Sequence, residues 1–65
     1  MEYKYFALGK APKVGENIQV NGRRANVRFV NDKRIFIGRS LILRQPELAM
    51  YKNLAAIRVG FEFIE

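Results

Sequence analysis

The chain has 65 residues, of which 49% are hydrophobic, and its 12 basic and 6 acidic side chains give a net charge of +6. It contains no Cys, His, Trp or Thr and a single serine, Ser40. This length allows one small domain, residues 1–65, and the hydrophobic content argues against a disordered tail. Without Cys and His, the residues that build disulfides, zinc fingers and imidazole-based catalysis are missing.

The sequence carries no pattern of an enzyme or of a membrane protein. Ser40 has no His to activate it, the carboxylates lack metal-ligand spacing, and no glycine-rich phosphate loop is present. The apolar runs are far shorter than the ~18–20 residues of a membrane-spanning helix, and the first residues do not resemble a signal peptide. We therefore expect a soluble cytoplasmic protein without catalytic activity, metal or cofactor.

The positive charge is concentrated between residues 23 and 44. This segment holds seven basic residues against one acid, Asp32, whereas the rest of the chain holds five of each sign. Six of the seven are arginines, whose planar guanidinium suits phosphate binding and stacking on bases. Because basic residues that only confer solubility need not be segregated, this distribution favours an anionic partner.

The first half of the chain reads as short strands separated by turns. Glu2–Leu8 is rich in aromatic residues and predicts a first strand. A loop over residues 9–15, bounded by glycines, leads to a second strand at Glu16–Val20. Asn21-Gly22 is typical of a type I′ hairpin turn, and Arg23–Val30 would form the third strand.

In the second half, strands surround one helical segment. Asn31-Asp32-Lys33 predicts a second turn and Arg34–Gly38 a fourth strand, which Leu41–Leu43 would resume. Pro46–Asn53 has a proline suited to the first helical position and apolar residues at helical spacing. Ala56–Ile64 alternates apolar and other residues as a final strand does.

The order of these elements predicts the fold class. Four strands, a short helix and a fifth strand indicate a mainly β domain, a small five-stranded antiparallel SH3-like barrel with the helix between strands 4 and 5. An oligonucleotide-binding barrel fits less well, because its helix usually follows the third strand.

The turns decide which side chains share a face of the sheet. A two-residue turn at Asn21-Gly22 pairs Asn17 with Asn26 and places apolar and polar residues on opposite faces. For the second hairpin, a two-residue turn would pair Phe29 with Arg34. A three-residue turn instead pairs apolar residues with each other, and it also brings Arg28 opposite Phe36. We prefer the three-residue turn.

These registers place cationic, amide and aromatic side chains on one face. The face consists of Asn17, Gln19, Arg24, Asn26, Arg28, Val30, Arg34 and Phe36. Arginines contact phosphates, amides contact bases, and an aromatic ring stacks on a base, although Phe36 has an equal claim to a place in the core. We expect a non-enzymatic nucleic-acid-binding module, with single-stranded DNA or RNA slightly preferred over duplex. The expected binding residues are Arg23, Arg24, Asn26, Arg28, Lys33, Arg34, Phe36 and Arg39, with Lys10 and Lys13 from the first loop.

A second interpretation is a protein-interaction or assembly module. The same basic face, with Phe36 and Val30 as apolar anchors, would suit an acidic protein surface, and the chain would be a monomer or a homodimer. Tyr3 and Tyr5 share one side of the first strand and would offer further stacking rings, although packing is the commoner role. Arg58 and Glu62 share a face of the last strand as an exposed pair of little energetic weight.

Overall fold

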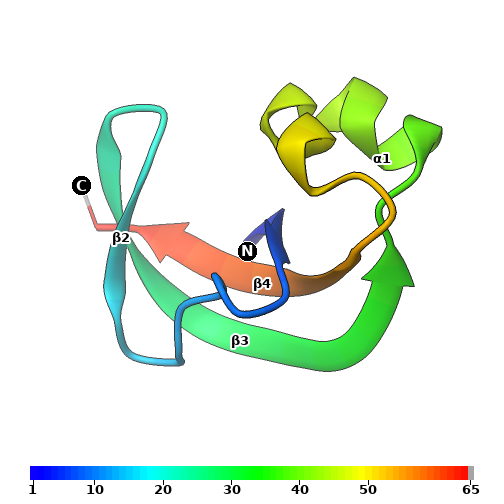
Figure 1. The fold of residues 1–65 in the computed structure, drawn as a ribbon. Coiled ribbons are helices and arrows are strands. Elements are labelled where there is room, and N and C mark those ends of the chain that lie inside the picture. The colour runs from blue at the N-terminus through cyan, green and yellow to red at the C-terminus, as the bar shows by residue number, and fades with distance from the viewer. Residues whose placement is uncertain (65) are drawn as a thin grey trace.

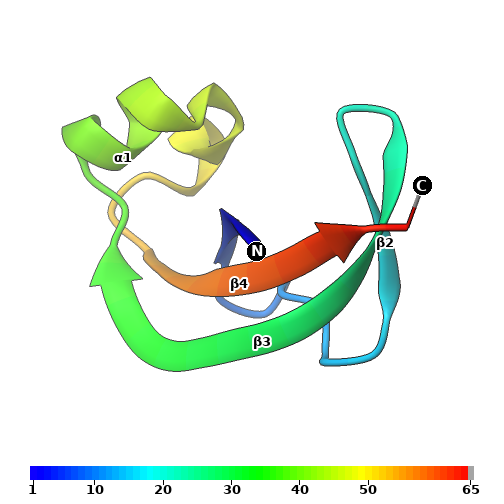
Figure 2. The ribbon, with the colours of Figure 1, turned by 180° about the vertical axis from the view of Figure 1, so that it is seen from behind.

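The computed structural model describes residues 1–64. Its elements are β1 (Glu2–Ala7), β2 (Asn17–Val20), β3 (Arg23–Phe36), α1 (Arg39–Arg44), the 3₁₀ helix η1 (Pro46–Tyr51) and β4 (Ala55–Phe63). All pairings are antiparallel, and the strand order is β1-β4-β3-β2. The long β3 curves along the molecule, with the helices near one end and the β2–β3 hairpin at the other (Figure 1). The view from behind shows the same separation (Figure 2).

The prediction of a small, mainly β antiparallel domain is confirmed, but the predicted barrel is not. Within residues 1–64 the sheet has four strands rather than five. Strands β1 and β2 lie at its two edges and do not pair with each other, so the sheet stays open. Two short helical segments, not one, precede the last strand.

The first hairpin has the predicted turn and register. Asn21 and Gly22 have φ angles of 54° and 79°, the left-handed values that a type I′ turn requires at both central positions. Val20 lies opposite Arg23, and Asn17 lies opposite Asn26. The turn and register of this hairpin are therefore those that its local sequence predicts.

The predicted second turn is wrong, because β3 runs through it. The strand continues for 14 residues, and its register slips between Asn31, which lies opposite Arg58, and Ile35, which lies opposite Ala56. Four steps on β3 thus match two on β4, so a bulge takes up the extra residues. The Asn31 side chain accepts a hydrogen bond of 2.9 Å from the Lys33 N–H, but none of residues 31–33 has positive φ. The turn-forming residues bend the strand instead of reversing it.

The segment after β3 is helical rather than extended. The apolar residues expected to resume a strand, Leu41–Leu43, lie in α1. Leu41 is buried and Leu43 is 76% exposed, so only part of this apolar run enters the core. The helix predicted from Pro46 is present, as 3₁₀ rather than α, and it ends at Tyr51 rather than Asn53. No helix of residues 1–64 has the length and apolar character needed to cross a bilayer.

The core includes two clusters at opposite ends of the sheet, and Val27, Ile57 and Val59 are buried as well. The cluster near the helices contains Ala7, Ile37, Leu41, Leu48 and Ala56. The hairpin cluster contains Val20, Ala25 and Phe61, with Ile18 and Phe63 packed against it. Ala56 and Phe61 are five residues apart on β4, so they face opposite sides of the sheet. The face that carries Ala56 packs against the helices at one end and continues through Arg58 and Gly60 toward the hairpin.

Candidate anion-binding groove

The amide residues predicted to contact nucleic acid lie on the β2–β3 hairpin, but Asn26 is already engaged. Asn17, Gln19, Arg24 and Asn26 share a face, as the register predicts. The Asn26 Nδ2 donates hydrogen bonds to Asn17 Oδ1 at 3.0 Å and to the Gly15 carbonyl at 3.1 Å. This amide therefore holds the preceding loop against β3.

Two arginines near the hairpin contact neighbouring side chains of β4. The Nε of Arg28 lies 3.0 Å from Glu62 Oε1, so Glu62 forms its ion pair across the sheet, whereas the sequence made it at best a diagonal neighbour of Arg58. The guanidinium of Arg23 lies 3.8 Å from the ring centre of Phe63. Ligand contacts by these two residues would compete with those existing interactions.

The structure does not form the single binding face predicted from sequence. Phe36 lies opposite Ala55, whereas Arg28 contacts Glu62, seven residues further along β4. At about 3.3 Å per residue this is roughly 23 Å, and an odd separation places the two on opposite faces. Phe36 is 65% exposed, but Arg28 is not beside it. The exposed Lys33 and Arg34 also belong to the half of β3 that is distant from the hairpin.

The two lysines of the first loop are exposed and lie outside the sheet. The backbone N–H of Lys13 donates to Glu16 Oε2 at 3.2 Å, which helps to shape the approach to β2. Neither Lys10 nor Lys13 lines the pockets around Arg44.

A different set of residues meets where α1 approaches β1. Tyr3, Tyr5, Arg44, Gln45 and Arg58 line a pocket of about 370 Å³. The lining thus contains two guanidinium groups, two phenol rings and one amide, and no carboxylate. Such a composition favours an anion, and in particular one attached to a planar ring.

Pairing between β1 and β4 positions Tyr3 and Arg58. Tyr3 lies opposite Gly60 and Tyr5 opposite Arg58, so all four residues share one face. The Arg58 guanidinium lies 4.6 Å from the Tyr3 ring centre. A Cβ at Gly60 would come within 3.2 Å of Tyr3 Cε1 and within 2.6 Å of Met1 Sδ. Because Gly60 has no side chain, the Tyr3 ring has room to lie against the sheet at this position.

Arg58 has an unsatisfied polar atom. Its Nε is buried, and within residues 1–64 this atom has no hydrogen-bond partner. A buried donor without a partner costs about 1–3 kcal/mol.

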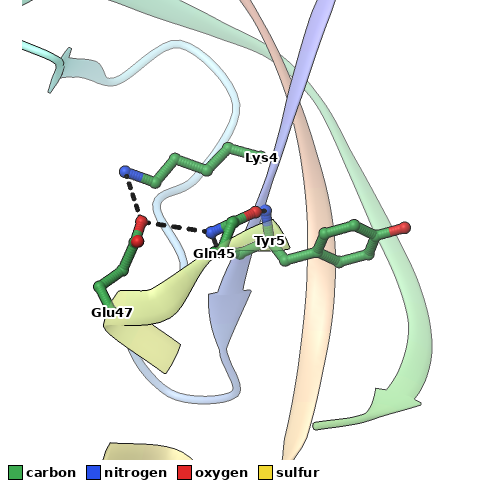
Figure 3. A network of polar contacts seen from close by, with 4 residues as sticks. All are labelled: Lys4, Tyr5, Gln45 and Glu47. Atoms are coloured by element: carbon green, nitrogen blue, oxygen red, sulfur yellow. Dashed lines mark hydrogen bonds and ion pairs between the residues drawn. The ribbon is translucent and has the colours of Figure 1, made fainter. Parts of the chain in front are cut away.

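Gln45 attaches the end of α1 to the edge of the sheet. Its Oε1 accepts a 2.7 Å hydrogen bond from the Tyr5 N–H, and its Nε2 donates to the Tyr5 carbonyl at 2.9 Å. The side-chain amide thus pairs with β1 much as a neighbouring strand would, and it fixes the adjacent Arg44 beside the pocket. Figure 3 shows this pairing, with the Tyr5 ring directed away from Lys4 and Glu47.

An ion pair and a further amide contact surround Gln45. Glu47 Oε2 lies 3.4 Å from Lys4 Nζ and 3.4 Å from Gln45 Nε2 (Figure 3). Its own backbone N–H lowers the pKa of the Glu47 carboxyl, and Lys4 and Gln45 add to this effect. The anionic form of Glu47 is therefore favoured, and it neutralises Lys4 rather than the two arginines.

Arg44 also lines two adjoining pockets, and we refer to the three pockets together as the groove. The second pocket is lined by Phe36, Arg39 and Ser40 among others. The third includes Arg23 and Phe63, together with the acidic Glu2 and Glu47. Three of the binding residues predicted from sequence thus line the groove: Arg23, Phe36 and Arg39. Arg28 and Arg34 do not line it.

Sequence reasoning did not bring together the residues at the centre of the groove. The sequence places Arg44 in the basic segment and offers Tyr3 and Tyr5 as stacking rings. No local pattern connects them with Arg58, because the contacts join β1, α1 and β4. Comparison with protein-family models, curated proteins and solved structures finds no match.

Proposed function

We propose that this protein is a non-enzymatic nucleic-acid-binding module that uses the groove. The observation that carries the proposal is the pocket in which Arg44 and Arg58 meet Tyr3 and Tyr5 without any carboxylate in the lining. Guanidinium groups bind phosphates, and aromatic rings stack on bases, so both components of a nucleotide have a complementary partner here. The net charge of +6 would attract a polyanion to the surface.

The first test is a fluorescence-anisotropy titration with a random-sequence oligonucleotide over a range of salt concentrations. We expect the affinity to fall steeply with salt, because each neutralised phosphate releases counterions. The double substitution Arg44→Gln/Arg58→Gln should weaken binding about tenfold or more. It should also reduce the slope of log K against log salt by about 0.7 for each phosphate contact that is lost on a single strand.

The matched control is Arg28→Gln/Arg34→Gln, which removes the same charge from residues that do not line the groove. We expect a loss of at most a few fold from this variant, through the general decrease in positive charge. An equal loss in both double variants would reject the groove as the binding site. No binding at low salt would reject nucleic acid as the ligand.

A second candidate function, docking on another protein, is favoured by a different observation. Leu43 of α1, Met50 of η1 and Leu54 just beyond it are all more than half exposed. Such apolar side chains are common at protein interfaces, and an acidic partner would also suit the basic groove. Under this hypothesis, partners recovered from a lysate would survive nuclease treatment and would be lost in the variant Leu43→Ser/Met50→Ser. Light scattering would show whether the chain associates with itself.

A further inference from the structure

We infer that the pocket between Arg44 and Arg58 holds one phosphate of a single-stranded nucleic acid, with the adjoining base stacked on Tyr3. This inference rests on the proposed function and deepens it, because it names the class of ligand and the place of one nucleotide. Three observations support it: Arg58 is held against the Tyr3 ring, Tyr3 is more than half exposed, and no carboxylate lines the pocket.

Arg58 is prepared to receive an oxyanion. The Tyr3 ring restrains its guanidinium at 4.6 Å, and its buried Nε lacks a hydrogen-bond partner within residues 1–64. In the same part of the chain neither Arg58 nor Arg44 forms an ion pair, whereas Arg28 pairs with Glu62. A phosphate oxygen would meet the Arg58 side chain where it lines the pocket, and because the Tyr3 ring already restrains the guanidinium, such preorganisation favours binding.

Tyr3 provides the surface for a base. Although Arg58 lies over its ring, Tyr3 is 52% exposed, so part of the ring is accessible to a ligand. At about 370 Å³ the pocket is within the range of small-ligand sites, although it is open to solvent. A phosphate between the arginines would therefore leave its neighbouring base within reach of Tyr3.

This arrangement selects an unpaired strand. In a duplex the bases are stacked inside and only the phosphates are on the surface, so a duplex could reach the arginines but not place a base on Tyr3. An unpaired strand can supply both groups together. Stacking on an aromatic ring is sufficient to change affinity by roughly five- to 150-fold per base.

The experiment compares three probes of equal length: oligothymidine, its duplex with oligoadenine, and an abasic strand that keeps the phosphates. We expect the protein to bind oligothymidine about tenfold or more tightly than the other two. Tyr3→Leu should remove most of this preference, and affinity for the abasic strand should change little. Arg58→Lys keeps the charge but loses the planar fork, so it should weaken oligothymidine binding several fold.

Two further variants separate positioning from charge. Arg34→Lys makes the same substitution outside the groove and should leave all three affinities unchanged within about twofold. Gly60→Ala keeps every binding side chain but crowds Tyr3, so it should lower the preference for oligothymidine. Thermal unfolding followed by circular dichroism verifies that each variant remains folded.

The results distinguish this inference from the proposed function. Equal affinities for the three probes would overturn the single-strand pocket and leave nucleic-acid binding intact. A preference for oligothymidine that persists in both Tyr3→Leu and Arg58→Lys would also overturn it, because the base would then stack elsewhere. Absence of binding to every probe at low salt would overturn both the inference and the proposed function.

Discussion

The arginines at the hairpin end of this sheet have different neighbours from those at its helix end. At the hairpin end, Arg28 pairs with Glu62 and Arg23 lies over Phe63, both on the neighbouring strand β4. At the helix end, Arg44 and Arg58 line one pocket, and within residues 1–64 neither has an ion-pair partner. Arg28 is therefore held in an ion pair, whereas Arg44 of the basic segment and Arg58 of β4 line the pocket without one.

The difference arises from how far apart the contacting residues are in the chain. The hairpin register follows from two adjacent residues, Asn21 and Gly22. The groove depends on contacts between distant parts of the chain: Gln45 attaches α1 to β1 across 40 positions in sequence, and Leu41 and Leu48 pack in one cluster with Ala7. Local chemistry therefore builds the hairpin end, whereas tertiary packing builds the candidate site.

The largest expected effect tests the core beneath the helix end. Ile37 is fully buried among Ala7, Leu41, Leu48 and Ala56. Ile37→Ala should cost about 2–5 kcal/mol through lost burial and a cavity. Since small domains have little stability to spare, we expect much of the Ile37→Ala protein to be unfolded already without urea. Urea titrations followed by circular dichroism measure this.

The control for this prediction is Leu43→Ala, which removes an exposed apolar side chain from α1. Its effect should stay within about 0.5 kcal/mol. If Ile37→Ala were equally mild, the helix end would contribute little to the stability of the domain. The groove would then be a flexible attachment rather than a formed site.

The second prediction concerns the contact that joins the two regions. Gln45→Leu removes both hydrogen bonds to the Tyr5 backbone, so it should destabilise the fold by about 1–3 kcal/mol. Hydrogen exchange should be faster at the Tyr5 amide, and nucleic-acid affinity should fall because Arg44 is no longer held in place. The matched variant Gln19→Leu, on the exposed edge strand β2, should change neither the hydrogen exchange at Tyr5 nor the nucleic-acid affinity. Unchanged exchange at Tyr5 in Gln45→Leu would contradict this account.

The hairpin end shows how far sequence reasoning can reach. Strand positions, the Asn21-Gly22 turn and its register follow from local preferences, and the helical turn after Pro46 follows from proline chemistry. The second turn was mispredicted because residues 31–33 have turn-forming side chains, yet β3 pairs with β4 on both sides of the slip, at Asn31 and at Ile35, so the strand continues through them. The face of Phe36 changed for another reason: the register also shifts between Val27 and Phe29, where one extra residue on β3 turns the following side chains to the opposite face. Only the three-dimensional arrangement could show that Arg58 meets Arg44 and Tyr3.

The third prediction tests whether the hairpin end depends on its turn. Gly22 has a φ of +79°, and a Cβ built there meets no atom within 4 Å. Gly22→Ala should therefore cost about 1–2 kcal/mol through backbone strain alone. Gly22→Asn should recover part of that loss, because asparagine tolerates left-handed geometry. Equal stability of the glycine and alanine proteins in urea titrations would show that pairing with β3, rather than the turn, fixes this hairpin.

The smallest effect concerns the acid beside the groove. The backbone N–H of Glu47, with Lys4 and Gln45, lowers the pKa of its carboxyl in the folded protein. Stability from this source is therefore fully present above the ordinary glutamate pKa and is lost as the pH falls through the lowered value. Because Glu47 is largely exposed, Glu47→Gln should cost only a few tenths of a kcal/mol at neutral pH.

The pH dependence separates this role of Glu47 from a role in binding. The stability difference between the wild-type protein and Glu47→Gln should disappear in acid, where both side chains are neutral. Urea titrations at neutral pH and at about pH 3 would measure it, and a difference that persists in acid would contradict the electrostatic explanation. At neutral pH the same variant should bind oligothymidine slightly more tightly, because one negative charge leaves the border of the groove. Weaker binding would instead mean that Glu47, by holding Lys4 and Gln45, keeps Arg44 in position for the ligand.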